Sequence, residues 1–421
     1  MELVRKTEPM NGTQQRELPY AWVIVALAAL IFAVSSGLRS TIGLLVRPWE
    51  VEFGWERAAV SLVASCSFLV AGLTQTYAGR LADRYGPRRV FTGSLVLLGL
   101  STAAMGVIQT LWQVYVIYSL ALAAAVGGAS NVTAAVAITR WIRHKVALAI
   151  GIVMAGGAVG QLGLVPIIAA FMHITGWRTV LAASGAAVLV LIVPLVVVLL
   201  YDNPPSRATS WVADTTADEP PQLLAALVRQ RNFWWLALGF GICGTTVGLV
   251  STHLIPYAED LRIDPVTAAT AFGVLGAVNV AATLAAGAIS DRWGHQRLLG
   301  TIYAGRAVVL IFLPFVHNPT TLFVFAIAFG AAYFPSVPPT TALATTLFGR
   351  RSGGTVVGLV WFSHQLGSAI GSYAGGLIHD VTGSYVLFFV AEALLCLAAA
   401  AMSWAIAEVS EPPVRTELSP V

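Results

Sequence analysis

The sequence predicts an all-helical integral membrane protein, with twelve transmembrane helices arranged as two six-helix halves. Its composition, a series of long apolar segments and an internal repeat lead to this prediction. The chain has 421 residues, of which 57% are hydrophobic and 10% are charged. A soluble protein of this size carries about 25% charged residues. The chain has too few polar residues to cover a surface in water, so its composition is typical of a protein embedded in lipid.

Twelve apolar segments are long enough to cross a bilayer as helices, which takes roughly 20 residues. The strands of a membrane barrel would be shorter and would alternate between apolar and polar residues. We therefore predict helices over residues 20–47, 58–79, 90–108, 113–139, 146–172, 178–201, 232–257, 265–289, 298–316, 321–347, 353–378 and 384–408.

The basic residues predict the orientation of these helices. With the N-terminus in the cytoplasm, 18 of the 24 Lys and Arg residues fall in cytoplasmic segments, whereas four lie outside and two lie within the membrane. Positive charge is enriched on the cytoplasmic side of membrane proteins. We therefore expect both termini in the cytoplasm and the chain in the inner (plasma) membrane of a prokaryotic cell.

The most polar internal stretch, residues 202–231, divides the predicted helices into six and six. Its proline, acidic and hydroxyl residues suit a cytoplasmic linker. The predicted organisation is listed from the N-terminus: a tail at 1–19, a six-helix half at 20–201, the linker at 202–231, a second half at 232–408 and a tail at 409–421. The first tail lacks the apolar core of a signal peptide, so we expect the first helix to be retained.

The two halves repeat each other. "LADRYGPRR" at 81–89 matches "ISDRWGHQR" at 289–297, and residues 138–160 run parallel to residues 345–367 at nearly the same offset. Repeats at one offset indicate two parallel halves, a plan that transporters use.

The segment "GRLADRYGPRR" places acidic and basic side chains in a turn between two predicted helices. Asp83 could accept hydrogen bonds from the start of a neighbouring helix, and Arg84 and Arg88 could pair with carboxylates or lipid phosphates. The alternative is ordinary cytoplasmic positive charge in a tight turn. The return of the motif in the second half favours a specific role.

With this motif, its weaker copy and twelve helices, the chain resembles the major facilitator superfamily. The resemblance implies alternating access, in which the two halves rock about a central site. It also implies that the motif residues form conformational latches on the cytoplasmic side, namely Gly79, Asp83, Arg84, Gly86, Arg88, Asp291, Arg292 and Gly294. The second copy departs from the pattern at His295 and Gln296.

Within that superfamily the chain resembles the monocarboxylate and oxalate/formate branch. The resemblance is carried by "YAWVIVALAALIFAVSSGLRSTIGLL", "FGWERAAVS" and "GTVVGLVWFSHQLGSAIGSYAGGLIHD". Members of this branch often carry an arginine in span eight, four residues after Asp or Asn. This chain has Asn279, but Thr283 stands at the arginine position. Animal members bind the substrate anion with basic residues near the end of span one, where Arg39 lies.

Arg39 lies inside the first apolar segment, about 7 Å beyond its midpoint at 1.5 Å per residue. An arginine at membrane depth costs from about 3 to more than 10 kcal/mol, so it needs a partner or a wet cavity. Either it binds an anion, or its long side chain reaches the outer headgroups.

Polar residues near the middle of other spans complete a predicted substrate site. Such residues can also simply join helices. His364 could bind substrate, carry a proton or be a satisfied histidine between helices. The predicted set is Arg39, Tyr118, Gln161, Thr246, Asn279, Thr283, Tyr333 and His364.

Two further charges lie inside apolar spans. Arg306 is near the middle of span nine, and Glu392 is at a similar depth in span twelve. We predict that Arg306 pairs with Glu392, or with backbone carbonyls, as internal structure. Prolines 335, 338 and 339 in span ten predict a kink or gate.

The predicted function is secondary active transport of a small organic anion, most simply a monocarboxylate, with proton coupling left open. Rival hypotheses are drug or metabolite efflux and a membrane receptor that moves no solute. The sequence has no phosphate-binding loop, catalytic triad or metal-ligand spacing, so we expect no enzyme activity, cofactor, metal or nucleic-acid partner. We expect the chain to work as a monomer in the bilayer.

Overall fold

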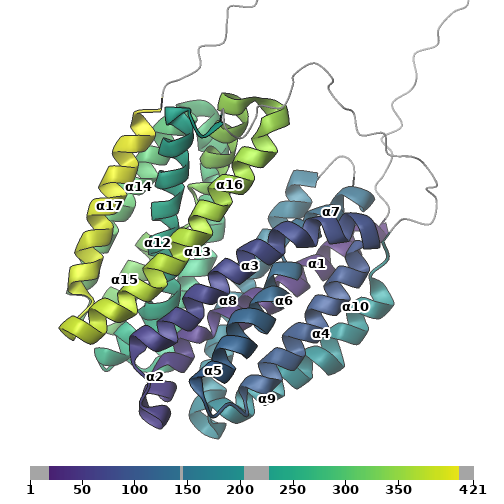
Figure 1. The fold of residues 1–421 in the computed structure, drawn as a ribbon, viewed down its shortest axis with the longest axis vertical. Coiled ribbons are helices and arrows are strands. Elements are labelled where there is room, and N and C mark those ends of the chain that lie inside the picture. Colours follow the sequence, from purple (N-terminus) through teal and green to yellow (C-terminus); the bar gives the residue numbers. More distant parts are fainter. Residues whose placement is uncertain (1–18, 143–145, 203–226, 407–421) are drawn as a thin grey trace, which may run out of the picture.

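The computed structural model describes residues 19–142, 146–202 and 227–406, and these form a bundle of helices in two groups (Figure 1). Residues before the linker form the first half, and residues after it form the second. The expected latch side chain of Asp291 lies outside the described side chains, although its backbone is helical.

The first half begins with a long span that Thr41 interrupts. Its elements are α1 (Pro19–Ser40), α2 (Ile42–Phe53), α3 (Arg57–Tyr85), α4 (Pro87–Met105), α5 (Leu111–Val114), the π-helical η1 (Tyr115–Leu122), α6 (Ala123–Gly128), α7 (Asn131–Trp141), α8 (Val146–Thr175), α9 (Trp177–Ala187), the π-helical η2 (Val188–Ile192) and α10 (Val193–Leu199).

The second half repeats this plan with fewer interruptions. Its elements are α12 (Arg231–Asp260), α13 (Pro265–Trp293), α14 (His295–Phe312), the 3₁₀ turn η3 (Leu313–Phe315), α15 (Pro319–Gly330), α16 (Val337–Thr382) and α17 (Val386–Trp404). Gly86 and Gly294, at matching places of the two repeats, both have positive φ, at 88° and 92°. Glycine adopts this conformation without strain, so both copies of the motif make the same sharp turn between helices.

Within the described ranges, nine helices are long and apolar enough to cross a membrane. Of the twelve predicted spans, the other three correspond to α4, to α15 with the start of α16, and to the rest of α16.

The predicted break between residues 347 and 353 is wrong, because α16 runs through it. The chain leaves the helix earlier, over residues 331–336, beside Pro335, Pro338 and Pro339. Proline lacks the N–H that a helix needs, which explains why the interruption lies there.

Glycines let helices cross with their backbones almost touching. A Cβ on Gly248 of α12 would meet the carbonyl oxygen of Ser368 at 2.0 Å, and one on Gly371 of α16 would meet that of Thr245 at 2.0 Å. In the first half, Gly160 of α8 approaches the Ala33 carbonyl of α1 equally closely. Small residues at such crossings drive helix association in membranes.

We therefore expect Gly371→Ala to lower the thermal unfolding midpoint of the purified protein by several degrees, because overpacking costs about 1–3 kcal/mol. Gly358→Ala, in the same helix but with no atom of the described residues within 4 Å of the added methyl group, is the matched control. An equal midpoint for the two variants would contradict this packing.

The halves meet mainly through α3 against α16 and α8 against α13. We call one end of the bundle the terminal end: α1 and α12 begin there, and α10 and α17 end there. At the opposite, far end, α2 and the start of α3 lie against the second half (Figure 1). Hydrogen bonds between the halves run from Arg47 at the far end to Phe68 near the middle of α3.

Candidate functional site

Arg39 lies in the last turn of α1, just before the interruption at Thr41. Its guanidinium lies 4.5 Å above the ring of Phe68 in α3, a buried residue, so it faces the interior of the bundle. Its Nη2 atom is buried and has no hydrogen-bond partner among the described residues. This geometry does not match a side chain that reaches for the headgroups.

Tyr118 and Gln161 lie beside Arg39 in the first half. Tyr118 belongs to the π-helical η1 and donates its hydroxyl to the Arg39 carbonyl at 2.8 Å. Gln161 Nε2 lies 3.2 Å from the Ser40 hydroxyl. A Cβ on Gly276 of α13 would lie 2.7 Å from Gln161 Oε1, so Gln161 also borders the second half. π-Helical bulges often occur at functional sites.

His364 lies within α16 and is 2% exposed. Its ring centroid is 4.7 Å from that of Phe240, 5.6 Å from Trp361 and 5.7 Å from Phe334. The Cys243 thiol is within hydrogen-bonding range of the His364 ring. A substrate-binding role for His364 therefore stays a prediction beside that of a histidine satisfied between helices.

Arg39 and Gln365, the residue that follows His364, both contact Phe68 of α3. The Phe68 ring lies under Arg39, and the Phe68 carbonyl accepts a hydrogen bond of 3.3 Å from Gln365, the neighbour of His364. Tyr333 of the second half is also within electrostatic range of Arg39. Arg39 of the first half therefore lies near Tyr333 of the second half, where the halves meet.

Asn279 and Thr283 lie one turn apart on α13. Asn279 Oδ1 accepts from the Phe334 N–H at 2.9 Å and from the Thr283 hydroxyl at 3.2 Å. Asn279 therefore fixes the non-helical segment that presents Tyr333 and Phe334.

Thr246 is the member of the predicted set that the structure places elsewhere. It is fully buried in α12, and its hydroxyl donates to the Cys243 carbonyl and accepts from Arg306. Thr246 therefore contributes to packing within the second half, because its hydroxyl contacts Arg306 of α14.

The direct ion pair predicted between Arg306 and Glu392 is wrong, and the alternative with backbone carbonyls is what the structure shows. Arg306 donates to the carbonyls of Ala332 and Tyr333. Glu392 instead accepts from the Thr245 hydroxyl at 2.7 Å. Arg306 donates to these carbonyls because the break in span ten leaves their oxygens free, while Glu392 feels the Arg306 charge without a direct ion pair among the described residues.

The latch motif makes its contacts inside the first half. Asp202 accepts from the Arg88 N–H at 2.8 Å at the start of α4, close to Gly86. Arg140 donates to the carbonyls of Ala82 and Asp83. Gly79 packs against Val132 of α7, and Arg84 lies 5.2 Å from the Tyr85 ring.

In the second copy of the latch motif, Gly294 makes the turn into α14, and Arg292 is exposed in the last turn of α13.

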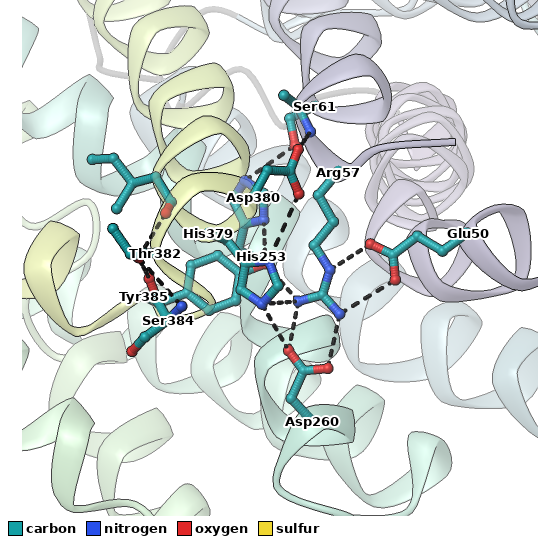
Figure 2. A network of polar contacts seen from close by, with 12 residues as sticks. Glu50, Arg57, Ser61, His253, Asp260, His379, Asp380, Thr382, Ser384 and Tyr385 are labelled. Carbon is teal, nitrogen blue, oxygen red and sulfur yellow. Dashed lines mark hydrogen bonds and ion pairs between the residues drawn. The ribbon is translucent and has the colours of Figure 1, made fainter. Parts of the chain in front are cut away.

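A cluster of polar residues joins the halves at the far end, and we call it the interhalf cluster: Glu50, Arg57, Asp260, His379, Asp380 and Tyr385. Figure 2 shows the Arg57 guanidinium between carboxylates of the two halves. Arg57, 4% exposed, donates to Asp260 at 2.5 and 2.8 Å and also bonds Glu50. Its Nη1 lies 3.1 Å from both His379 Nε2 and the Tyr385 hydroxyl.

Further bonds extend this cluster. The Ala58 N–H donates to Asp380 at 2.7 Å, which ties the first turn of α3 to the end of α16. His253 is 1% exposed and lies 3.0 Å from the Tyr385 hydroxyl and 3.4 Å from that of Ser61. Removal of one member of such a buried pair is strongly destabilising, because it leaves the other charge unpaired.

The interhalf cluster cannot be found from the sequence alone. By sequence, Arg57 is one of the four basic residues expected outside the membrane. The available signal was opposite charge at the same predicted depth: Arg57 at the start of one span and Asp260 at the end of another. Many other pairs fit that description, and only the packing of the halves selects this one.

The comparisons with known proteins identify the family. The family model of the Major Facilitator Superfamily matches residues 25–372 and, in a second match, residues 254–420. The chain belongs to the Major Facilitator Superfamily, whose members are membrane transporters.

Individual relatives cover nearly the whole chain. It is 24% identical to monocarboxylate transporter 13 of Rattus norvegicus, over 94% of this chain and 90% of the relative. It is also 24% identical to the oxalate:formate antiporter of Oxalobacter formigenes, over 98% of each. Among solved structures, an inward-facing bacterial homolog of the human lysosomal transporter Spinster has a TM-score of 0.75 at 19% identity, over 92% of this chain and 96% of that one.

Proposed function

We propose that the protein is a secondary active transporter that moves a small organic anion of the monocarboxylate class by alternating access. The observation that carries this proposal is Arg39, a fixed positive charge in a membrane span with a buried, unbonded Nη2 atom. A charge at membrane depth is expensive unless it serves a ligand or a partner. A carboxylate would satisfy the free N–H groups with charge-assisted hydrogen bonds.

The second half would supply the other contacts. His364 lies among aromatic rings, and Tyr333 and Asn279 flank it through the Phe334 segment. Some relatives have an arginine in span eight at the place of Thr283. In this chain Arg39 would supply the positive charge for the substrate instead. The names of the monocarboxylate and oxalate:formate relatives support an anionic substrate.

The observed conformation fits one step of the cycle. The interhalf cluster closes the far end, which we place outside the cell, with both termini in the cytoplasm of the inner membrane. The site would then be open toward the cytoplasm, and the latch residues would be released from the opposite half. His364 is our candidate for proton coupling, because histidine side chains serve as proton shuttles.

The proposal predicts that small monocarboxylates bind the purified protein. Ligand at 100 times its Kd stabilises a protein by about 2.7 kcal/mol, so a thermal-shift screen should show a clear rise in the unfolding midpoint. Lactate and formate are the test ligands, oxalate tests whether a dicarboxylate also binds, and lactamide, which has the shape of lactate without its charge, is the matched control.

An equal shift with lactamide, or shifts with hydrophobic cations alone, would reject the anion and favour efflux of drug-like compounds. Uptake into proteoliposomes with and without an imposed proton gradient then tests the coupling. A rate that does not respond to the gradient would remove His364 from that role.

A further inference from the structure

The break in span ten leaves backbone groups that a continuous helix would satisfy. Residues 331–336 separate α15 from α16. In a continuous helix the Val337 N–H would bond the Tyr333 carbonyl, but here it bonds that of Phe334 at 2.9 Å. Freed carbonyls inside a membrane protein need another donor, because no lipid group can supply one.

Arg306 of α14 is that donor, and it is fully buried. Its Nε donates to the Ala332 carbonyl at 2.9 Å and its Nη2 to the Tyr333 carbonyl at 2.5 Å. Its Nη1 donates to the Thr246 hydroxyl of α12 at 3.0 Å. One guanidinium therefore ties the broken span to two helices, as its rigid fork of five donors allows.

The segment that Arg306 holds carries residues of the proposed site. Tyr333 lies within electrostatic range of Arg39, and the Phe334 ring lies 5.7 Å from that of His364. Asn279 holds the same segment from the other side through the Phe334 N–H. A shift of the segment would therefore move Tyr333 and Phe334 relative to both Arg39 and His364.

We propose that Arg306 is a positioning residue for transport: it fixes the broken part of span ten so that Tyr333 and Phe334 are held against the substrate. This inference rests on the proposed function, because it assigns the partners of Arg306 to the substrate site. Lysine would keep the charge but could not reach both carbonyls and Thr246 at once, because its three N–H donors share one nitrogen.

The test compares Arg306→Gln and Arg306→Lys with Glu392→Gln, which alters the nearby buried charge without touching the segment. Lactate uptake into proteoliposomes gives KM and kcat for the folded protein. We expect at least a tenfold rise in KM for Arg306→Gln, a smaller rise for Arg306→Lys and an unchanged KM for Glu392→Gln. A KM that stays at the wild-type value in folded Arg306→Gln would overturn the inference, whatever the loss of thermal stability.

A second readout does not depend on substrate. Hydrogen exchange of the amides in residues 331–336 should be faster in Arg306→Gln than in the wild type and in Glu392→Gln. If the wild type binds no organic anion, the proposed function fails while this exchange still reports whether Arg306 holds the segment. Unchanged exchange in Arg306→Gln would overturn the inference by itself.

Discussion

Arg39→Gln is expected to abolish uptake of the organic anion by reconstituted protein. The loss of one partner of a buried charge pair costs about 2–5 kcal/mol, which is roughly 30-fold or more in affinity. Glutamine keeps a similar length and two N–H donors but carries no charge. The measurement is uptake of labelled substrate, together with the ligand-induced shift of the unfolding midpoint.

Folding should not suffer in this variant. The guanidinium has an unpaired, buried Nη2, so its removal relieves a cost of the ligand-free state, and the unfolding midpoint should hold or rise. Arg80→Gln makes the same charge change at an exposed position of α3 and should leave uptake intact. Undiminished uptake by the Arg39 variant would reject the assigned role.

Arg57→Gln is expected to open the far end of the bundle. Arg57 bonds Asp260, His379 and Tyr385 of the second half. The loss of one member of a buried ion pair costs about 3–5 kcal/mol, which is enough to shift a two-state equilibrium roughly 100-fold or more. The population should therefore move away from the conformation in which the far end is closed.

Reactivity of an introduced cysteine measures this opening. Ser61 is fully buried beside the interhalf cluster, so Ser61→Cys, in a chain with Cys66 replaced by serine, should react slowly with a membrane-impermeant thiol reagent added outside. Adding Arg57→Gln should speed that reaction by at least tenfold. Glu50→Gln removes only a partner within the first half and should have a smaller effect. Equal, slow labelling in all three proteins would show that Arg57 does not keep the far end closed.

The sequence predicted the membrane spans and the repeat because these depend on local properties. Hydropathy is a property of each segment alone, so helices appear at the predicted places, apart from the break in span ten. The prolines of that span predict an interruption but not its exact position. The run of small and basic residues at 347–353 resembles a turn in sequence, yet nothing in it prevents a helix.

The candidate site was partly predictable for the same reason. A charged or polar residue in an apolar span is conspicuous whatever its neighbours, so Arg39, His364 and Arg306 could be named in advance. Their partners could not. By sequence, Arg306 could pair with Glu392 or with backbone carbonyls. It bonds the carbonyls, because the break in span ten leaves them without helical partners.

The sequence by itself determined that this chain is a two-half helical membrane protein with fixed charges inside its spans. Only the tertiary structure decided which charges meet. Arg57 and Asp260 are 203 residues apart and belong to different halves. Their bond exists only while the two halves are in contact at the far end. No local sequence pattern encodes that contact, because it depends on the balance of contacts across the whole interface between the halves.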